Sequence, residues 1–287
     1  MGQHYEENPY PRWSRLPSLP AINTELYLTH DLGYEPEGAS APIDQILIAG
    51  CGTGQQPLQL LMLLRDKAID AMDLSRASLG YAAMMAERYG VGDRLNLFQG
   101  DILELPNLDA LYDLIQSSGV IHHMEDPAAG LAALTACLRP GGWLRLGLYS
   151  ETARRHIRTL RDAYGQDQDL ADPVTLRQLR QRLLADQSEA AKQVSLIADF
   201  YTLSGFRDLL FHRQEHRYTI PMIADMLPAE GLEFMGFSLP NQAVRDQYRA
   251  SFPDDPNMLS LENWHRFEQA NPDTFLAMYN FWCRRPG

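Results

Sequence analysis

Short apolar runs alternate with helical patterns between residues 44 and 150, and this alternation constrains the fold more than any other feature. The run Gln45–Ala49 is ended by glycines and has the length and composition of a buried parallel strand. The two patterns then repeat, with strands predicted at 45–49, 68–74, 95–99, 112–117 and 143–149 and helices at 58–64, 75–89 and 128–138. Such alternation predicts a parallel sheet with helices on both faces.

The alternation stops after Tyr149. Helices are predicted at 22–31, 151–164, 173–186, 188–198, 205–211 and 220–230, and further strands at 232–239 and 279–284. The two late strands are expected to pair antiparallel at the sheet edge. Helical excursions at 151–219 and 241–277 are expected over the carboxyl ends of the strands, where this architecture binds ligands. Arg139–Gly142 contains Pro and Gly and predicts a turn before the fifth strand.

Four parts are therefore predicted: an N-terminal arm at 1–43, a core at 44–150, a helical cap at 151–219 and a C-terminal part at 220–287. The arm contains Pro9 and Pro11, which exclude a regular helix there. We expect that deleting residues 1–19 leaves the sheet intact. Trp264, Phe267 and Phe275 are expected in the core of the C-terminal part.

The chain has 287 residues and a formal net charge of −12. This acidic balance argues against nucleic acid as the main partner, because nucleic-acid binders carry a basic field. The three cysteines are too few and too scattered for a disulfide framework. No apolar run approaches the length of about 18 residues that a membrane helix requires, and a cytoplasmic enzyme is the resulting expectation.

The loop Gly50-Cys51-Gly52-Thr53-Gly54 lies between a predicted strand and a predicted helix. Glycines there permit a tight turn and close approach of the backbone to a ligand at the helix N-terminus. The spacing is GxGxG, and Gln55 stands where a dinucleotide-binding loop has its third glycine. Asp73 ends the second strand and can accept hydrogen bonds from two ribose hydroxyls, and Asp101 follows the third strand. The alternative is that both acids only cap helices or turns.

Five motifs in order resemble those of the class I S-adenosylmethionine-dependent methyltransferases. The matching segments are 46–54, 71–75, 99–102, 119–127 and 138–142. The resemblance implies an α/β fold with a Rossmann-like, doubly wound sheet of seven strands. It implies S-adenosyl-L-methionine as cofactor and S-adenosyl-L-homocysteine as product. The loop glycines would contact the methionine part, Asp73 the ribose, and Asp101 with Ile102 the adenine. The predicted cofactor-binding residues are Gly50, Cys51, Gly52, Thr53, Gly54, Gln55, Asp73, Leu74, Asp101, Ile102 and Ser117.

A narrower group of bacterial methyltransferases, some of which carry tetratricopeptide repeats, is similar to this chain at 8–13, 148–150, 211–217 and 281–283. This second resemblance implies no particular substrate. It leaves a protein acceptor open, because such repeats usually bind proteins.

Candidate catalytic residues are His122 and His123 after the fourth strand and Tyr149 at the end of the fifth. A base is needed only if the acceptor arrives protonated, and histidine is the commonest side chain for that task. The competing interpretation is that the histidines are hydrogen-bonded loop residues. His123 occupies a position that is usually histidine in methyltransferases of this type, which favours an architectural role.

Candidate substrate-binding residues are drawn from the arm and the cap: Tyr10, Trp13, Arg154, Arg207, His212 and His216. Arginine forks match carboxylate or phosphate oxygens, so an anionic acceptor is one hypothesis. The segment His212–His216 also matches H-x-x-E-H, which holds zinc when it lies on a helix. We predict no metal, because methyl transfer already explains the surrounding pattern.

The sequence thus predicts a methyltransferase that acts on a small-molecule or protein acceptor. Two alternatives are an enzyme of the same fold that performs other chemistry with the bound cofactor, and a non-catalytic cofactor-binding subunit. No oligomeric state follows from the sequence.

Overall fold

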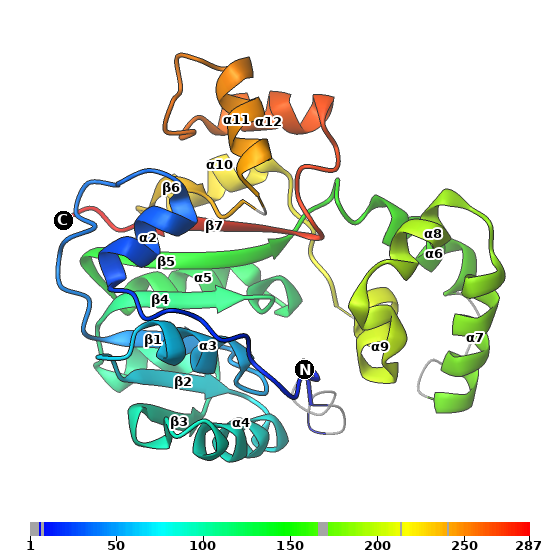
Figure 1. The fold of residues 1–287 in the computed structure, drawn as a ribbon, viewed down its shortest axis with the longest axis horizontal. Helices are drawn as coiled ribbons and strands as arrows, with labels where there is room; N and C mark the ends of the chain where they lie inside the picture. Colours follow the sequence, from blue (N-terminus) through cyan, green and yellow to red (C-terminus); the bar gives the residue numbers. More distant parts are fainter. Residues whose placement is uncertain (1–5, 7–8, 166–171, 213, 240) are drawn as a thin grey trace.

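The computed structural model describes residues 6, 9–165, 172–212, 214–239 and 241–287. Its sheet has seven strands in the order β3-β2-β1-β4-β5-β7-β6. The parallel strands are β1 (Ile46–Ala49), β2 (Ile69–Asp73), β3 (Leu95–Gln99), β4 (Tyr112–Ser118) and β5 (Leu138–Tyr149). The two antiparallel edge strands are β6 (Glu233–Phe237) and β7 (Met278–Arg284). The expected seven-stranded α/β architecture is confirmed, with β7 inserted between β5 and β6 (Figure 1).

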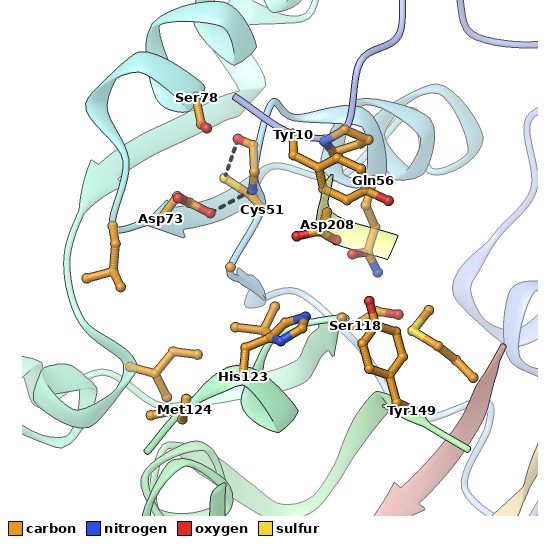
Figure 2. A pocket seen from close by; sticks show the side chains of 18 of the residues that line it. Tyr10, Cys51, Gln56, Asp73, Ser78, Ser118, His123, Met124, Tyr149 and Asp208 are labelled. Atoms are coloured by element: carbon orange, nitrogen blue, oxygen red, sulfur yellow. Dashed lines mark hydrogen bonds between the residues drawn. The ribbon is translucent and has the colours of Figure 1, made fainter. Parts of the chain in front are cut away.

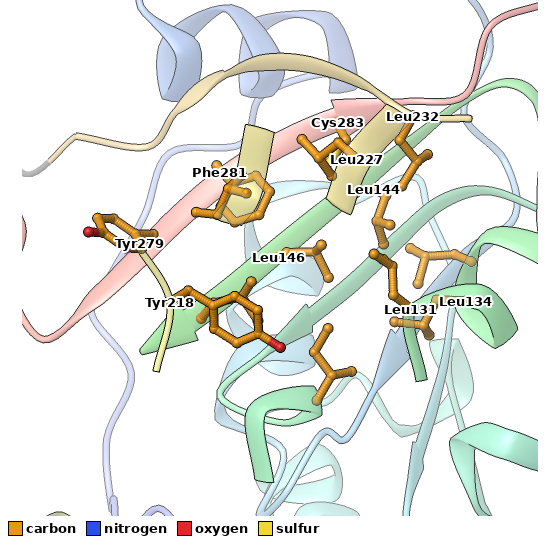
Figure 3. Close-up of a cluster of buried hydrophobic side chains, with 14 of the residues drawn as sticks. Leu131, Leu134, Leu144, Leu146, Tyr218, Leu227, Leu232, Tyr279, Phe281 and Cys283 are labelled. Carbon is orange, nitrogen blue, oxygen red and sulfur yellow. The ribbon is translucent and has the colours of Figure 1, made fainter. Parts of the chain in front are cut away.

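Helices cover both faces of this sheet, and each face has its own hydrophobic core. The first face carries α2 (Thr24–Leu32), α3 (Gln55–Leu63) and α4 (Arg76–Arg88). The second face carries α5 (Pro127–Ala136) and α10 (Ile220–Ala229). Successive side chains of a strand point to opposite faces. In β5, therefore, Trp143 packs into the first core and Leu144 into the second, where it meets Leu131 and Leu134 of α5 (Figure 3).

The predicted cap region folds around a third core. Its helices are α6 (Arg155–Tyr164), α7 (Pro173–Ala185), α8 (Glu189–Ser195), the short 3-10 helix η4 (Ala198–Tyr201) and α9 (Leu203–Phe211). Phe200 and Phe206 are fully buried at its centre, with ring centroids 5.2 Å apart. Figure 1 shows α6 to α9 as a separate lobe beyond one end of the strands. Because this lobe has its own core, it can hold side chains over the sheet without contributing strands.

The last excursion contains α11 (Gln242–Ser251) and α12 (Leu261–Ala270). Trp264 and Phe267 of α12 are buried against Phe237 and Phe275, as expected for core residues of the C-terminal part. Among the described helices, none is long and apolar enough to cross a membrane.

The predicted turn at Arg139–Gly142 is wrong, because these residues belong to β5, which begins at Leu138. Leu138 pairs with Tyr112, and the register then shifts before Leu114 pairs with Trp143. Gly141 adopts a φ of 77° and donates its N–H to the carbonyl of Arg285. Pro and Gly therefore mark an irregularity inside a paired strand, because their backbone groups find partners across the sheet.

Candidate functional site

A cavity of about 830 Å³ lies between the loop that joins β1 to α3 and the cap lobe. Its size falls within the range of about 300–1,000 Å³ that is usual for ligand pockets. Asp73 and Cys51 stand on one side of it, Tyr149 and Asp208 on the other, and His123 lies between them (Figure 2). One continuous space therefore joins the glycine-rich loop to the cap.

The loop backbone lies too close to its neighbours for side chains at the glycines. A Cβ atom at Gly50, whose φ is 79°, would stand 2.4 Å from a methyl carbon of Val120. At Gly52, with a φ of 51°, it would stand 2.4 Å from the Tyr10 carbonyl oxygen. Both glycines line the cavity, so their backbone is open to a ligand. Gly52 is thus required by the arm above the loop as well as by any ligand.

Asp73 fixes the shape of this loop. Its Oδ2 accepts a hydrogen bond from the Gly52 N–H at 2.8 Å, and its Oδ1 accepts one from the Ser75 N–H at 2.9 Å. Burial raises the pKa of Asp73, and these backbone hydrogen bonds act in the opposite direction. Each carboxylate oxygen keeps a second lone pair. Asp73 lines the cavity, and it can therefore hold the loop and accept bonds from a ligand together.

Asp101 stands at the start of the 3-10 helix η2 (Ile102–Leu108), and its Oδ1 accepts the Leu103 N–H at 3.0 Å. The capping role considered from the sequence is therefore present. Asp101 also lines the cavity, together with the apolar side chains of Ile102 and Leu74. This corner combines one acceptor with apolar walls, which suits a heterocyclic base.

The N-terminal arm is bound to the loop by three hydrogen bonds. The Tyr10 carbonyl accepts the Thr53 N–H at 3.2 Å, and Thr53 Oγ1 donates to the Pro11 carbonyl at 2.6 Å. Trp13 Nε1 donates to Thr53 Oγ1 at 3.1 Å, and its ring contacts Tyr81 edge-on. Thr53 and Trp13 thus connect the arm to the loop and do not line the cavity.

Tyr10 continues from the arm to the cap. Its hydroxyl donates to Oδ2 of Asp199, in η4, at 2.8 Å. Burial raises the pKa of Tyr10, and the charges of Asp199 and Asp208 raise it further. The phenol therefore stays protonated, and it links three parts of the chain across the top of the cavity.

His122, His123 and Tyr149 form one stack. The His122 ring lies 4.3 Å from the His123 ring and 3.9 Å from the Tyr149 ring, measured between centroids. His122 is fully buried and does not line the cavity, whereas His123 and Tyr149 do. Burial lowers the pKa of His122 well below its ordinary value, and the neighbouring His123 and Arg154 lower it further. His122 is thus a neutral packing partner of the other two rings.

His123 Nδ1 lies 2.8 Å from the Gln214 carbonyl oxygen. A carbonyl can only accept, so Nδ1 carries the proton and the other ring nitrogen, Nε2, is the one able to take one up. The backbone after α9 also donates from His216 N to the His122 carbonyl and from Tyr218 N to the Tyr149 carbonyl, both at 2.8 Å. Residues 214–218, which we name the strap, therefore hold the whole stack in place.

Arg154 is buried, and its charge is compensated within the strap. Its Nη2 and Nε lie 2.7 and 3.0 Å from the two carboxylate oxygens of Glu215. Its guanidinium carbon stands 3.7 Å from the centroid of the Tyr149 ring. Arg154 lines the cavity, whereas Arg207 does not. The basic run Arg207, His212, His216 and Arg217, on which the hypothesis of an anionic acceptor rested, lies outside the lining, and the one arginine of the cap in the lining, Arg154, is compensated by Glu215.

The metal-binding interpretation of His212–His216 requires a helix, whereas the described residues 212 and 214–216 lie outside any helix. Helix α9 ends at Phe211, and Arg154 Nη2 donates to the carbonyl of Leu209 in its last turn at 2.9 Å. The His212 ring stacks on His123 at 3.7 Å instead. In the described part of the chain, no group of three His, Cys, Asp or Glu residues is placed to hold a metal ion.

Twelve of the residues selected from the sequence line the cavity: Gly50, Cys51, Gly52, Gln55, Asp73, Leu74, Asp101, Ile102, His123, Tyr149, Tyr10 and Arg154. Eight lie outside its lining: Thr53, Gly54, Ser117, His122, Trp13, Arg207, His212 and His216. In place of the fully buried Ser117, its neighbour Ser118 lines the cavity and donates to Asn280 at 3.1 Å. Adjacent residues of a strand point to opposite faces of the sheet. Which of the two serines faces the cavity is decided only once the register of β4 is known.

Sequence reasoning missed Asp199, Asp208, Gln56 and Gln214 in the cavity lining. Gln56 is the second residue of α3, directly beyond Gln55, and this position beside the loop was the signal for it. The other three reach the cavity only because the cap folds back over the sheet. Of these, Asp208 belongs to the dense polar cluster at 206–218, which was a signal for a substrate pocket, although Asp208 itself was not selected.

The strand order, the glycine-rich loop and the acid that ends β2 define a Rossmann-like protein with a cofactor site at the carboxyl ends of its strands. Residues 46–142 match a family model described as a methyltransferase domain. This segment of the chain is therefore similar to methyltransferase domains.

Two curated relatives illustrate the similarity. An uncharacterized protein of a Synechococcus strain is 32% identical over 231 residues, which cover 78% of this chain and 55% of the relative. The malonyl-[acyl-carrier protein] O-methyltransferase of Serratia marcescens is 34% identical over 129 residues, 45% of this chain and 46% of that protein. The chain thus spans about half the length of these relatives.

A solved structure shares the fold over most of the chain. PKMT2 from Rickettsia typhi, in complex with AdoHcy, superposes with a TM-score of 0.63 at 16% identity. The match covers 93% of this chain and 54% of that one.

Proposed function

We propose that this protein is a methyltransferase that uses S-adenosyl-L-methionine and releases S-adenosyl-L-homocysteine. The observation that carries the proposal is the single cavity that joins the glycine-rich loop and Asp73 to Tyr149 and the cap. Such a cavity is large enough to seat a cofactor and an acceptor side by side, as group transfer requires. The methyltransferase domain at residues 46–142 and the AdoHcy complex of a similar fold support it.

The cofactor is assigned to the loop side of the cavity. Backbone groups at Gly50 and Gly52 would contact its amino-acid part, Asp73 its ribose and Asp101 its adenine, between Leu74 and Ile102. When bound, S-adenosyl-L-methionine supplies a methyl group activated by a positive sulfur. The protein's own task is to orient the acceptor and exclude water, which Tyr10 serves by closing the space between loop and cap.

His123 is the proposed proton acceptor. Its Nδ1 is committed to the Gln214 carbonyl, so the lone pair belongs to Nε2, on a ring that lines the cavity. A positioned base of this kind contributes roughly 10²–10⁴-fold to a rate when the acceptor must lose a proton. His122, through a tilted ring contact, and Tyr149, through an edge-on one, position this ring.

The acceptor is proposed to enter on the cap side, and both a small molecule and a protein group fit this position. The O-methyltransferase among the relatives acts, by its name, on malonyl-[acyl-carrier protein]. That name does not decide between the two classes here, because the aligned part covers 46% of that protein.

The test is a binding and turnover experiment with purified protein. Calorimetry is expected to show binding of both S-adenosyl-L-methionine and S-adenosyl-L-homocysteine. Incubation of a cell extract with methyl-labelled cofactor is expected to yield labelled product and S-adenosyl-L-homocysteine in equal amounts. Cofactor binding without any labelled product in any extract fraction would indicate a non-catalytic binder. A changed substrate with no transferred label would indicate other chemistry at the same site.

A further inference from the structure

The cap side of the cavity has a definite charge. Five carboxylates and two guanidinium groups are among the described residues that line the whole cavity. Both guanidinium groups are paired with acids outside it: Arg154 with Glu215 at 2.7 Å and Arg145 with Asp31 at 3.3 Å. Two of the carboxylates, Asp199 and Asp208, belong to the cap, and Oδ1 of Asp208 lies 4.0 Å from Nε2 of His212. Their charges make the acceptor side electronegative, and a cleft lined by one sign of charge concentrates ligands of the other.

The hydroxyl of Tyr149 supplies a second, independent observation. Tyr149 is 9% exposed, and within the described part of the chain its hydroxyl has no hydrogen-bond partner. The His122 ring and the Arg154 guanidinium both contact the Tyr149 ring, and the hydroxyl end of Tyr149 points into the cavity (Figure 2). The hydroxyl is open to the cavity and keeps its full hydrogen-bonding capacity, so it can bind a polar group of a ligand.

Tyr10 holds one of the two cap carboxylates in place. Its hydroxyl donates to Asp199 at 2.8 Å, which fixes that carboxylate beside the cavity. Burial raises the pKa of Tyr149, Arg154 opposes this, and Asp208 raises it further, so the charges of the cap acids act at Tyr149. Both phenols stay neutral, and the negative charge of this wall resides on Asp199 and Asp208.

Building on the methyltransferase function above, we propose that the acceptor is a primary or secondary alkylammonium group held by Asp199, Asp208 and the Tyr149 hydroxyl, and that its nitrogen is methylated. An ammonium group has up to three N–H donors and no acceptor, which matches two carboxylates and a phenol oxygen. A carboxylate or phosphate group would meet like charge at the same place.

The chemistry balances with the residues present. The ammonium group loses one proton to Nε2 of His123, which frees the nitrogen lone pair. The nitrogen then forms a bond to the methyl carbon while the carbon–sulfur bond breaks, and the bonding pair stays on sulfur as S-adenosyl-L-homocysteine. The product is a methylated ammonium group after His123 returns its proton or releases it to solvent. His123 suits this task because Nδ1 is held by the Gln214 carbonyl at 2.8 Å.

The experiment compares three probes of equal length on the protein saturated with S-adenosyl-L-homocysteine. We expect n-pentylammonium to bind at least about tenfold more tightly than pentanol or pentanoate, as measured by calorimetry. Asp199→Asn and Asp208→Asn should each weaken n-pentylammonium about tenfold and leave the affinity for S-adenosyl-L-homocysteine within about twofold. Glu125→Gln is the matched control, because Glu125 lines the mouth but is exposed. If Asp208→Asn fails to fold, Asp199→Asn decides, since Asp199 is only half-buried.

Stronger binding of pentanoate, or unchanged binding of n-pentylammonium in the Asn variants, overturns this inference. Failure of S-adenosyl-L-homocysteine to bind the unaltered protein overturns the proposed function instead, so the two failures are distinct. A labelled-methyl experiment separates the sources of the ammonium group: label in acid-precipitated protein indicates lysine side chains, and label in the soluble fraction indicates a free amine. Label on oxygen or sulfur in either fraction contradicts the inference.

Discussion

Burial changes the chemistry of individual residues at the site. His122 has no exposed surface and stays neutral, because burial lowers its pKa well below the ordinary value. Asp73 experiences the opposite effect, since burial raises the pKa of a carboxyl group while backbone donors at Gly52 and Ser75 counteract it. These two residues therefore respond in opposite senses when the pH changes, and each supports a test of its own.

Asp73→Ala should weaken cofactor binding about tenfold or more. The substitution removes a charged hydrogen-bond acceptor, which is worth roughly 1.5–3 kcal/mol, and it also releases the Gly52 N–H. Calorimetry with S-adenosyl-L-homocysteine measures the effect. Asp70→Ala is the matched control, because Asp70 lies on the same strand and outside the cavity lining. Equal affinity in all three proteins would remove Asp73 from the cofactor site.

His122 should make the protein less stable in mild acid. Its pKa is lower in the folded state than in the unfolded state, so the unfolded chain binds the extra proton. Stability from this group is complete above an unfolded pKa of about 6.5 and is lost as the pH falls toward the folded value, by up to about 1.4 kcal/mol per pH unit. Melting temperatures between pH 8 and pH 5 test this.

In His122→Asn the melting temperature should fall less between pH 8 and pH 5 than in the unaltered protein, whatever the absolute stability of the variant. The exposed His30 provides the control, since His30→Asn should keep the full pH dependence. Parallel curves for the unaltered protein and His122→Asn would show that another group is responsible.

At the scale of elements, the strap at 214–218 connects the cap to the rings of His122, His123 and Tyr149. It supplies the carbonyl that holds His123, and its Glu215 neutralises Arg154. Glu215 also contacts Arg161 and Arg217, at 3.4 and 3.3 Å. The side chains of Arg154 and Glu215 are 1% and 2% exposed, so this pair has little solvent screening. A buried pair of this kind is strongly sensitive to the loss of one partner.

Glu215→Gln should therefore destabilise the protein by about 3–5 kcal/mol, because it leaves the Arg154 charge buried without compensation. Glu151→Gln removes a partially exposed partner of Arg158 and Arg217 and should cost no more than about 1 kcal/mol. Urea denaturation of the two variants provides the comparison. Equal losses would mean that the burial of the Arg154 pair has no energetic consequence.

At the scale of the whole molecule, the arm, the loop and the cap close one cavity together. The arm reaches the loop through Thr53 and reaches the cap through Tyr10 and Asp199. Its following part belongs to the core, because Trp13 and Leu16 pack against the first hydrophobic face beside Tyr81 and Tyr89. We therefore expect that the residues before Trp13 can be removed without loss of stability, whereas removal of Trp13 and the residues after it destabilises the protein.

Two truncations test this division. Removal of residues 1–11 should weaken binding of S-adenosyl-L-methionine about tenfold and lower the melting temperature by no more than about 4 °C, because Trp13 remains. Removal of residues 1–19 should weaken binding equally and also cost about 2 kcal/mol or more, because a large half-buried ring is lost. Calorimetry and thermal unfolding measure the two effects. Identical melting temperatures would show that Trp13 contributes no packing energy.

The sequence by itself determined the parts of this protein that depend on neighbours along the chain. The apolar runs at β1, β2, β4 and β5 and the helical spacing between them predict the sheet, because strand and helix periods are local properties. The GxGxG loop and Asp73 were also readable, since a turn after a buried strand and an acid at the end of the next strand meet at one sheet edge.

Tertiary structure alone decided which cap residues face that edge. Asp199, Asp208 and Gln214 reach the cavity through a lobe with its own core, far from the loop in sequence. The same packing ends α9 before His212 and commits Arg154 to Glu215, so two patterns that predicted ligand binding became internal contacts. The physical reason is that a buried charge or the end of a helix pairs with a polar group that the fold places beside it. That group is distant in the sequence, so the local spacing of residues does not predict it.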